Sequence, residues 1–149
     1  MFGTAAIEDS AKRMAALRAA LQAAMPSRVH KTGYQRDIAD HAPEELRAGV
    51  VMLVVGQESD FNDSVGMEAR EGTLSVALVL HLMVEGDSDG ASVEAEELAA
   101  CQQIKQFVRA GVPGIGLTLA NIYQSAQQET PYGYVVAELR AGPPRNNVN

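Results

Sequence analysis

Residues 74–84, LSVALVLHLMV, decide the fold of this chain, because apolar side chains recur at every second position along the whole stretch. This alternation is typical of a β-strand. One face of the strand carries Leu74, Val76, Leu78, Leu80, Leu82 and Val84. The opposite face carries Thr73, Ser75, Ala77, Val79, His81 and Met83 and becomes apolar toward its end. We therefore expect the second face to be covered as well.

Three further strands are predicted around this one. Val50 to Val55 is a continuous β-branched and aliphatic run, and Leu117 to Gln124 and Tyr132 to Arg140 follow later in the chain. The last two are joined through SAQQETPYG, which contains the turn-forming residues of a hairpin connection. The sequence thus predicts two pairs of strands.

Each strand pair follows a predicted helix. Between Thr4 and Ala24, apolar residues recur at three- and four-residue steps, with an N-cap expected at Gly3 or Thr4. A second helix is expected from the Ser92 cap to Gly111, with an apolar stripe at Val93, Leu98, Cys101, Ile104, Lys105 and Val108. The polar segment Pro26 to Gly49 between the first helix and the first strand is expected to be a long connector with a short helical turn after Pro43.

This order predicts an α+β fold with a mainly antiparallel four-stranded sheet, and with the N-terminal helix and the second helix packed on one face. A doubly wound parallel sheet would need helices between all consecutive strands, and that alternation is absent from the sequence. We assign residues 1–141 to a single domain and residues 142–149 to a polar C-terminal tail. A chain of 149 residues has the length of one ordinary domain.

Composition and charge narrow the function classes. Apolar residues make up 46% and charged residues 21%, as in folded globular chains. The formal net charge of -7 disfavours binding that neutralises many phosphates of a nucleic acid. No apolar run reaches the length of a membrane span, and the first residues lack the pattern of an export signal, so we expect a cytoplasmic protein with no membrane partner.

The stretch from Gly56 to Gly72, GQESDFNDSVGMEAREG, raises the question of a metal site. Laid on the calcium-loop pattern from Asp60, it places Asn62, Ser64 and Glu71 at ligand positions. The sixth position, however, is Val65 where the pattern requires Gly, and the flanks are strands. A solvated hairpin tip explains the same residues better.

The remaining chemical groups do not form a catalytic motif. GVPGIG (residues 111–116) closes a helix and opens a strand, the reverse of a phosphate-binding loop. His30, His41 and His81 share no metal-ligand spacing, and Cys101 lies near an apolar helix stripe where a buried structural thiol is expected. We therefore expect no catalytic residue, no metal, no cofactor and no enzymatic activity.

The order of elements resembles the tail terminator proteins of long-tailed bacteriophages, which are minor tail proteins. The resemblance runs from Thr4 to Ala141 and follows the helix, the connector, AGVVMLVVGQES, GTLSVALVLHLMVEG, EAEELAACQQIKQFVRA, LTLANIYQSAQQE and YGYVVAELRA. It implies a structural virion protein, made in the cytoplasm of a bacterial host, that forms a hexameric ring at the head-proximal end of the tail. Such a ring caps the tail tube, stops its polymerisation and provides the docking surface for the head connector. DNA would pass through its channel without specific binding.

Two surfaces are predicted to serve this role. The apolar part of the second strand face, with Val79, His81 and Met83, is expected at the subunit interface. The hairpin tip is expected to dock an axial neighbour through Glu58, Asp60, Phe61, Asp63, Glu68, Arg70 and Glu71. The alternatives are another head-tail connector such as a stopper, a tail tube component, or a small α+β enzyme or ligand-binding domain.

Overall fold

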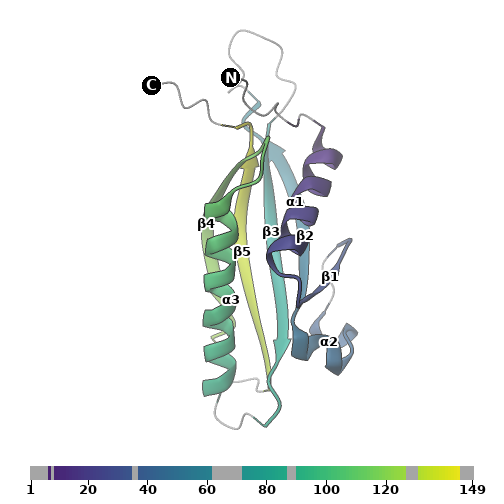
Figure 1. Cartoon of the computed structure of the whole chain (residues 1–149), viewed down its shortest axis with the longest axis vertical. Helices are drawn as coiled ribbons and strands as arrows, with labels where there is room; N and C mark the ends of the chain where they lie inside the picture. The colour runs from purple at the N-terminus through teal and green to yellow at the C-terminus, as the bar shows by residue number, and fades with distance from the viewer. Residues whose placement is uncertain are drawn as a thin grey trace.

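The structure of the chain is a computed structural model that describes residues 7, 9–34, 37–61, 72–86, 90–126 and 131–144. In these residues, one sheet runs along the length of the molecule (Figure 1). Helices pack on both of its faces. The strands are β1 (Val29–Lys31), β2 (Val50–Ser59), β3 (Thr73–Met83), β4 (Gly116–Gln124) and β5 (Tyr132–Gly142). They lie in the order β1-β2-β3-β5-β4.

The α+β class is confirmed, but the prediction of a mainly antiparallel sheet with four strands is wrong in the number of strands. The sheet has five strands and is mixed, because the short β1 pairs in parallel with β2 through Val29↔Val50 and Lys31↔Met52. The other neighbouring pairs, β2 with β3, β3 with β5 and β5 with β4, are antiparallel. β1 contains only three residues of the polar connector, so no alternating apolar pattern marks it in the sequence.

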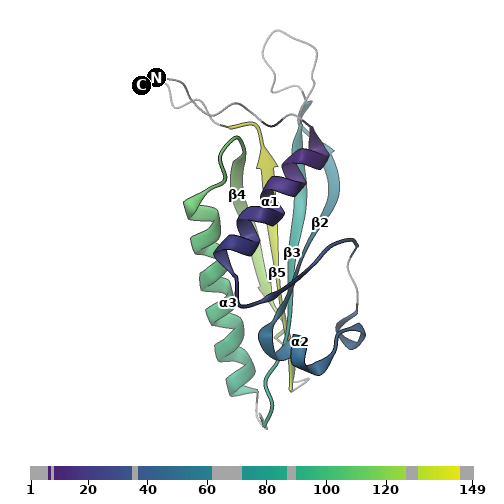
Figure 2. The same ribbon diagram turned by 45° about the vertical axis from the view of Figure 1, so that its right-hand side comes forward.

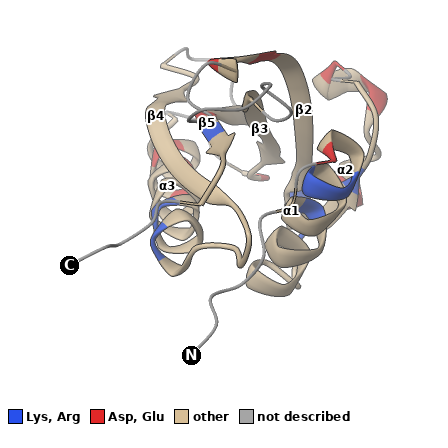
Figure 3. Ribbon diagram, turned by 90° about the horizontal axis from the view of Figure 1, so that it is seen from above, with Lys and Arg blue, Asp and Glu red and all other residues tan. Residues whose placement is uncertain are grey.

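Helices α1 (Ser10–Ala24) and α3 (Ala91–Ala110) cover the same face of the sheet, as Figure 3 shows along the strand direction. The face of β3 predicted to be aliphatic lies under them. The main core combines this face with matching residues of the other long strands and with both helices. Its fully buried members include Leu17, Leu78, Leu80, Ile104, Val135 and Ala137.

Both long helices differ in detail from their predictions. α1 begins at Ser10 and not near Thr4, because the Asp9 side chain caps it by accepting from the backbone N–H of Lys12 at 3.0 Å. Ile7 precedes the helix and its N–H donates to the Gly114 carbonyl. The predicted caps Gly3 and Thr4 lie outside the described residues.

The buried stripe of α3 also differs from the predicted one. Leu98 is 53% exposed, whereas its neighbour Glu97 is only 2% exposed. Val93, Cys101 and Ile104 face the core as expected. The helix ends at the expected place, where Gly111 is the C-cap with φ of 76°.

The connector covers the opposite face of the sheet at one end. After β1 it forms the 3-10 helix η1 (Ile38–Asp40) and then α2 (Pro43–Ala48), which begins with the predicted proline. Figure 2 places α2 at the lower end of the sheet, away from α1. A second cluster of buried residues forms beneath it, with the members Leu46, Val50, Met52, Val79 and Met83.

The observed strands are longer than predicted at some ends. β2 continues from Val55 to Ser59 because its pairing with β3 resumes after a bulge at Gly56, and β5 continues to Gly142 because Ala141 and Gly142 pair with β4. A second bulge interrupts β4 at Ala120. Both bulges lie near the level of Val76 in β3.

Candidate functional site

The three residues predicted to form a subunit interface are buried inside the chain. Val79 is 1% exposed, His81 5% and Met83 8%. Val79 and Met83 pack with Leu46 of α2 and Met52 of β2. The expectation of a covered face was therefore sound, but the connector of the same chain supplies the cover.

His81 belongs to a hydrogen-bonded series that ties the connector to β3. Lys31 Nζ lies 3.0 Å from His41 Nδ1, and His41 Nε2 lies 3.2 Å from His81 Nδ1. An ammonium group has donors only, so His41 Nδ1 accepts from Lys31. His41 then carries its proton on Nε2 and donates to His81 Nδ1. We call Lys31, His41 and His81 the histidine chain.

The charges around the histidine chain come from several elements. Lys31 Nζ also donates to Glu45 Oε1 at 3.0 Å, and the same oxygen accepts from the backbone N–H of Ala42. The hydrogen bond from Lys31, followed by the one from Ala42, lowers the pKa of Glu45. Burial, followed by the repulsion that a protonated His41 would exert, lowers the pKa of His81, while Asp37 acts in the opposite direction.

The described residues include only the first part of the predicted docking loop. The Glu58 carboxylate forms hydrogen bonds within the chain. Its Oε1 accepts from Ser10 Oγ at 2.8 Å, and its Oε2 accepts from the Gly72 N–H at 2.7 Å. Asp60 has a positive φ of 60°, and Phe61 is 38% exposed at the end of β2. The other residues predicted for this loop lie outside the described residues: Asp63, Glu68, Arg70 and Glu71.

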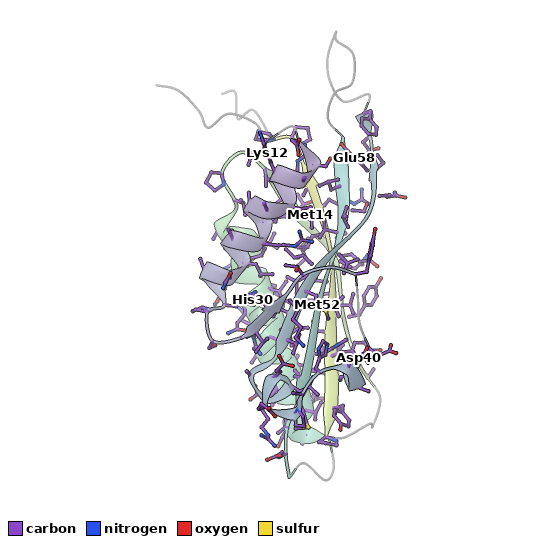
Figure 4. The ribbon with its side chains drawn as sticks, turned by 90° about the vertical axis from the view of Figure 1, so that its right-hand side faces the viewer. Lys12, Met14, His30, Asp40, Met52 and Glu58 are labelled. Carbon is purple, nitrogen blue, oxygen red and sulfur yellow. The ribbon has the colours of Figure 1, made fainter. Side chains whose placement is uncertain are left out.

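A buried arginine joins the strand ends near this loop. Arg13 of α1 is fully buried and its Nη1 donates to the Gly72 carbonyl at 2.8 Å and to the Ala141 carbonyl at 3.0 Å. Its Nε donates to the Ile7 carbonyl at 3.1 Å. Figure 4 shows the neighbouring Lys12 and Met14 on α1 at the same end of the molecule as Glu58. The guanidinium therefore fixes the base of the predicted docking loop.

An exposed tyrosine face lies on β4 and β5, beside the connector. Tyr123 is 49% exposed, Tyr132 41% and Tyr134 36%. Tyr134 is the cross-strand partner of His81, and Tyr132 that of Met83, so these tyrosines share the face that the connector covers on the neighbouring strand β3. Tyr123 is paired with Val136 on the same face, diagonal to Tyr134. We call Tyr123, Tyr132 and Tyr134 the tyrosine face.

Beyond the tyrosine face, the same side of the sheet has a shallow groove of about 280 Å³. Small residues line its floor, with Gly56 and Ala120 at the two bulges, and Glu138 and Arg140 contribute charges. Asn121 Nδ2 donates to Glu138 Oε2 at 3.0 Å. The Glu138 carboxylate also raises the pKa of Tyr123. The groove thus continues this face of the sheet beyond the tyrosine face, across β2, β3 and β5.

The two long edges of the sheet differ from each other. β4 forms one edge along its nine residues. At the other edge β1 pairs only with Val50 to Met52. From Leu53 to Ser59 no described strand lies on the outer side of β2, opposite to β3, and Arg18 Nη2 donates to the Leu53 carbonyl there. The molecule therefore offers two unlike strand edges.

Glu97 and Cys101 belong to residue types that can take part in catalysis, but in this fold both have structural roles. Glu97 Oε2 accepts from Ser125 Oγ at 2.5 Å and from the Tyr134 N–H at 3.1 Å, which ties α3 to the ends of β4 and β5. Cys101 is buried in the main core, and burial raises the pKa of its thiol. A raised pKa leaves less of the reactive thiolate at neutral pH.

The sequence predicts the position of the tyrosines but not the contact between the two histidines. The alternation in Tyr132-Gly133-Tyr134-Val135 already places the two tyrosines opposite the core side of β5. The pairing of His41 with His81, in contrast, joins residues 40 positions apart through the fold of the connector. No spacing in the sequence indicates that contact.

The described residues contain no candidate metal site and no candidate membrane span. Within them, no three His, Cys, Asp or Glu side chains are grouped so as to hold a metal ion. Most of the calcium-loop pattern, including Asn62, Ser64 and Glu71, lies outside these residues. None of the described helices has both the length and the apolar character needed to cross a bilayer.

The chain matches no known protein family model and no curated protein.

Proposed function

We propose that the chain is a structural subunit of a bacteriophage tail, a tail terminator that forms a hexameric ring on the tail tube. In this role it stops polymerisation of the tube and presents a surface to the head connector. It acts through contacts between proteins and needs no catalytic residue. The order of sequence elements suggests the family, and the surfaces of the fold support a role in assembly.

The observation that carries the proposal is the tyrosine face. Tyr123, Tyr132 and Tyr134 are each more than a third exposed and lie together on one side of β4 and β5. Tyrosine is enriched in protein interfaces, because its ring buries a large apolar area while its hydroxyl group keeps a hydrogen-bond partner. A contact with another protein would bury these rings.

The unlike edges of the sheet fit a closed ring. In a ring, each subunit uses one surface to contact the next subunit and a different surface to contact the previous one. β4 and the outer edge of β2 beyond Met52 lie at opposite sides of the sheet. In the proposed ring, the β4 edge belongs to the contact with one neighbouring subunit, and the β2 edge belongs to the contact with the other.

The net charge supports a channel for DNA. The formal net charge of -7 is unfavourable for retaining a polyanion by counterion release. A positively charged channel lining would bind the DNA phosphates and slow the passage of the genome.

The proposal is tested by letting the tail tube protein of the same phage polymerise with and without the chain. We expect tubes of limited length in its presence. The double variant Tyr123→Asp and Tyr134→Asp should fold but bind tubes at least about tenfold more weakly, as expected for loss of an interface anchor.

Tyr34→Asp is the matched control, because Tyr34 is 82% exposed and belongs to the connector, outside the tyrosine face. It should limit tube length as the unchanged chain does. A chain that stays monomeric and leaves tube length unregulated would contradict the proposal. A chain that polymerises into tubes by itself would instead be a tube component.

A further inference from the structure

The histidine chain holds the connector to the sheet through two rings that must both be neutral. His41 comes from the connector and His81 from β3, and both are buried, each with 5% exposure. The bond between them, 3.2 Å long, needs a hydrogen on His41 Nε2 and a lone pair on His81 Nδ1. The bond from Lys31 needs a second lone pair, on His41 Nδ1.

We propose that mild acid releases residues 29–34 and 37–48 of the connector from the rest of the sheet, while the face covered by α1 and α3 stays folded. This conformational device goes beyond the proposed tail function and does not depend on it. Release of the connector would uncover the apolar residues Val79 and Met83.

Protonation of either ring breaks a bond of the histidine chain. A proton on His41 Nδ1 occupies the lone pair that accepts from Lys31. A proton on His81 Nδ1 faces the hydrogen on His41 Nε2. Each event also places a new positive charge near Lys31 or beside a second ring, in a buried setting where charges are poorly screened.

The other groups around the two rings have opposing effects. Lys31 on β1 disfavours a charged histidine, whereas Glu45 on α2 and Asp37 before η1 favour one. Tyr134 is the cross-strand neighbour of His81 on β5. For His81, burial and His41 outweigh Asp37, so its pKa is lowered.

The sign of the pH effect follows from this lowered pKa. The neutral ring contributes stability that is complete above the pKa of His81 in the unfolded chain, near 6.5. That contribution is lost as the pH falls through the lower pKa of the folded state. The response is therefore expected on the acid side of about pH 6.5.

The response is expected to be local because the described part of the connector has few other attachments to the sheet, apart from the exposed ion pair of Arg47 with Glu85. β1 pairs with β2 at three positions, and the cluster beneath α2 has five buried members, far fewer than the main core. The ends of the segment are held by bonds that do not titrate in this range. Arg28 donates to the Gln103 side chain of α3 and to the Ala48 carbonyl. A released connector thus stays attached at both ends.

Hydrogen exchange of the full chain at pH 7.5 and pH 5.0 tests the proposal, with each rate referred to the intrinsic rate at that pH. Protection of α2, including the amides of Leu46 and Gly49 that bond to Ala42 and Glu45, should fall at least about tenfold. Protection of α3 between Ala100 and Val108 should change less than about twofold. Equal loss in both regions, or no loss in α2, would overturn the proposal.

Variants assign the effect to the histidine chain. The double variant His41→Gln and His81→Asn keeps polar groups of similar reach but cannot titrate, so the pH response of α2 should disappear. His30→Gln is the control, because His30 Nε2 pairs with the Met25 carbonyl and lies outside the histidine chain. A response that persists in the double variant, or that is abolished by His30→Gln alone, would contradict the assignment.

Discussion

Arg13 is a fully buried charge whose three described bonds all lead to backbone carbonyls. A charge in such a place is tolerated only when hydrogen bonds replace its water shell. Arg13 thereby joins α1 to the segment before it and to the ends of β3 and β5. Its role is to hold the base of the predicted docking loop in one arrangement.

Arg13→Met should lower the free energy of unfolding by about 3 kcal/mol, because the Gly72 and Ala141 carbonyls lose a charged donor in a buried place. Urea unfolding followed by circular dichroism measures the change. Lys12→Met is the matched control on the same helix, where the side chain is exposed, and it should cost less than about 0.5 kcal/mol. Equal losses in both variants would show that the buried bonds contribute nothing.

Gly133 is a position where the packing leaves no room for a side chain. A Cβ added there would lie 2.5 Å from Glu97 Oε2 and 2.6 Å from Val93 Cγ1. Gly133→Ala should therefore destabilise the chain by about 2 kcal/mol through overpacking. Thermal unfolding of the variant measures this loss.

Gly56→Ala is the control for Gly133→Ala. At Gly56 the nearest atom to an added Cβ is the Ser75 carbonyl oxygen, at an ordinary contact distance of 3.8 Å. This variant should stay within about 0.5 kcal/mol of the unchanged chain. A larger loss at Gly56 than at Gly133 would contradict the packing described for α3.

Glu97 shows why residue-level burial was only partly predictable. Periodicity favours an apolar residue on the core side of α3 and therefore selected Leu98. The structure buries Glu97 because Ser125 and the Tyr134 N–H satisfy its carboxylate. These partners come from residues 28 and 37 positions away, which no local pattern reveals.

At the scale of elements, α1 depends on its N-cap. The Asp9 carboxylate accepts from the Lys12 N–H in the first turn. Asp9→Ala should cost about 1 kcal/mol, whereas Asp9→Asn keeps the acceptor and should recover most of that loss. Melting temperatures should differ by roughly 2–4 °C between the two variants. Identical melting would show that the cap does not stabilise α1.

The long elements could be predicted because their patterns are local. The alternation in β3 and the steps of three and four in α1 and α3 each identify an element without reference to the rest of the chain. β1 could not be predicted in this way. Its three residues become a strand only because β2 provides a partner in parallel register, and tertiary contacts of this kind leave no periodic signal.

The candidate site, too, could be predicted where a local pattern marks it and not where it depends on tertiary contacts. The second face of β3 was correctly expected to be covered, since Val79, His81 and Met83 follow a clear alternation. The covering element could not be identified, because the path of the connector depends on contacts such as Leu46 with Met52 and His41 with His81. Tyr123 and Tyr134 became a common face only once the pairing of β4 with β5 was known.

At the scale of the whole molecule, the sheet is covered on one face by two long helices and on part of the other face by the connector. The remainder of that second face carries the tyrosine face and the groove, between two unlike strand edges. This distribution favours contacts with other proteins along β4 and β5. It is the structural basis of the proposed ring.

Electron microscopy of the purified chain, alone and mixed with tail tubes of the same phage, tests the central proposal most directly. We predict ring-shaped particles with six-fold symmetry at one end of the tubes, and no rings from the Tyr123→Asp and Tyr134→Asp double variant. Tubes without a ring at either end, with the folded chain remaining monomeric in solution, would contradict the account.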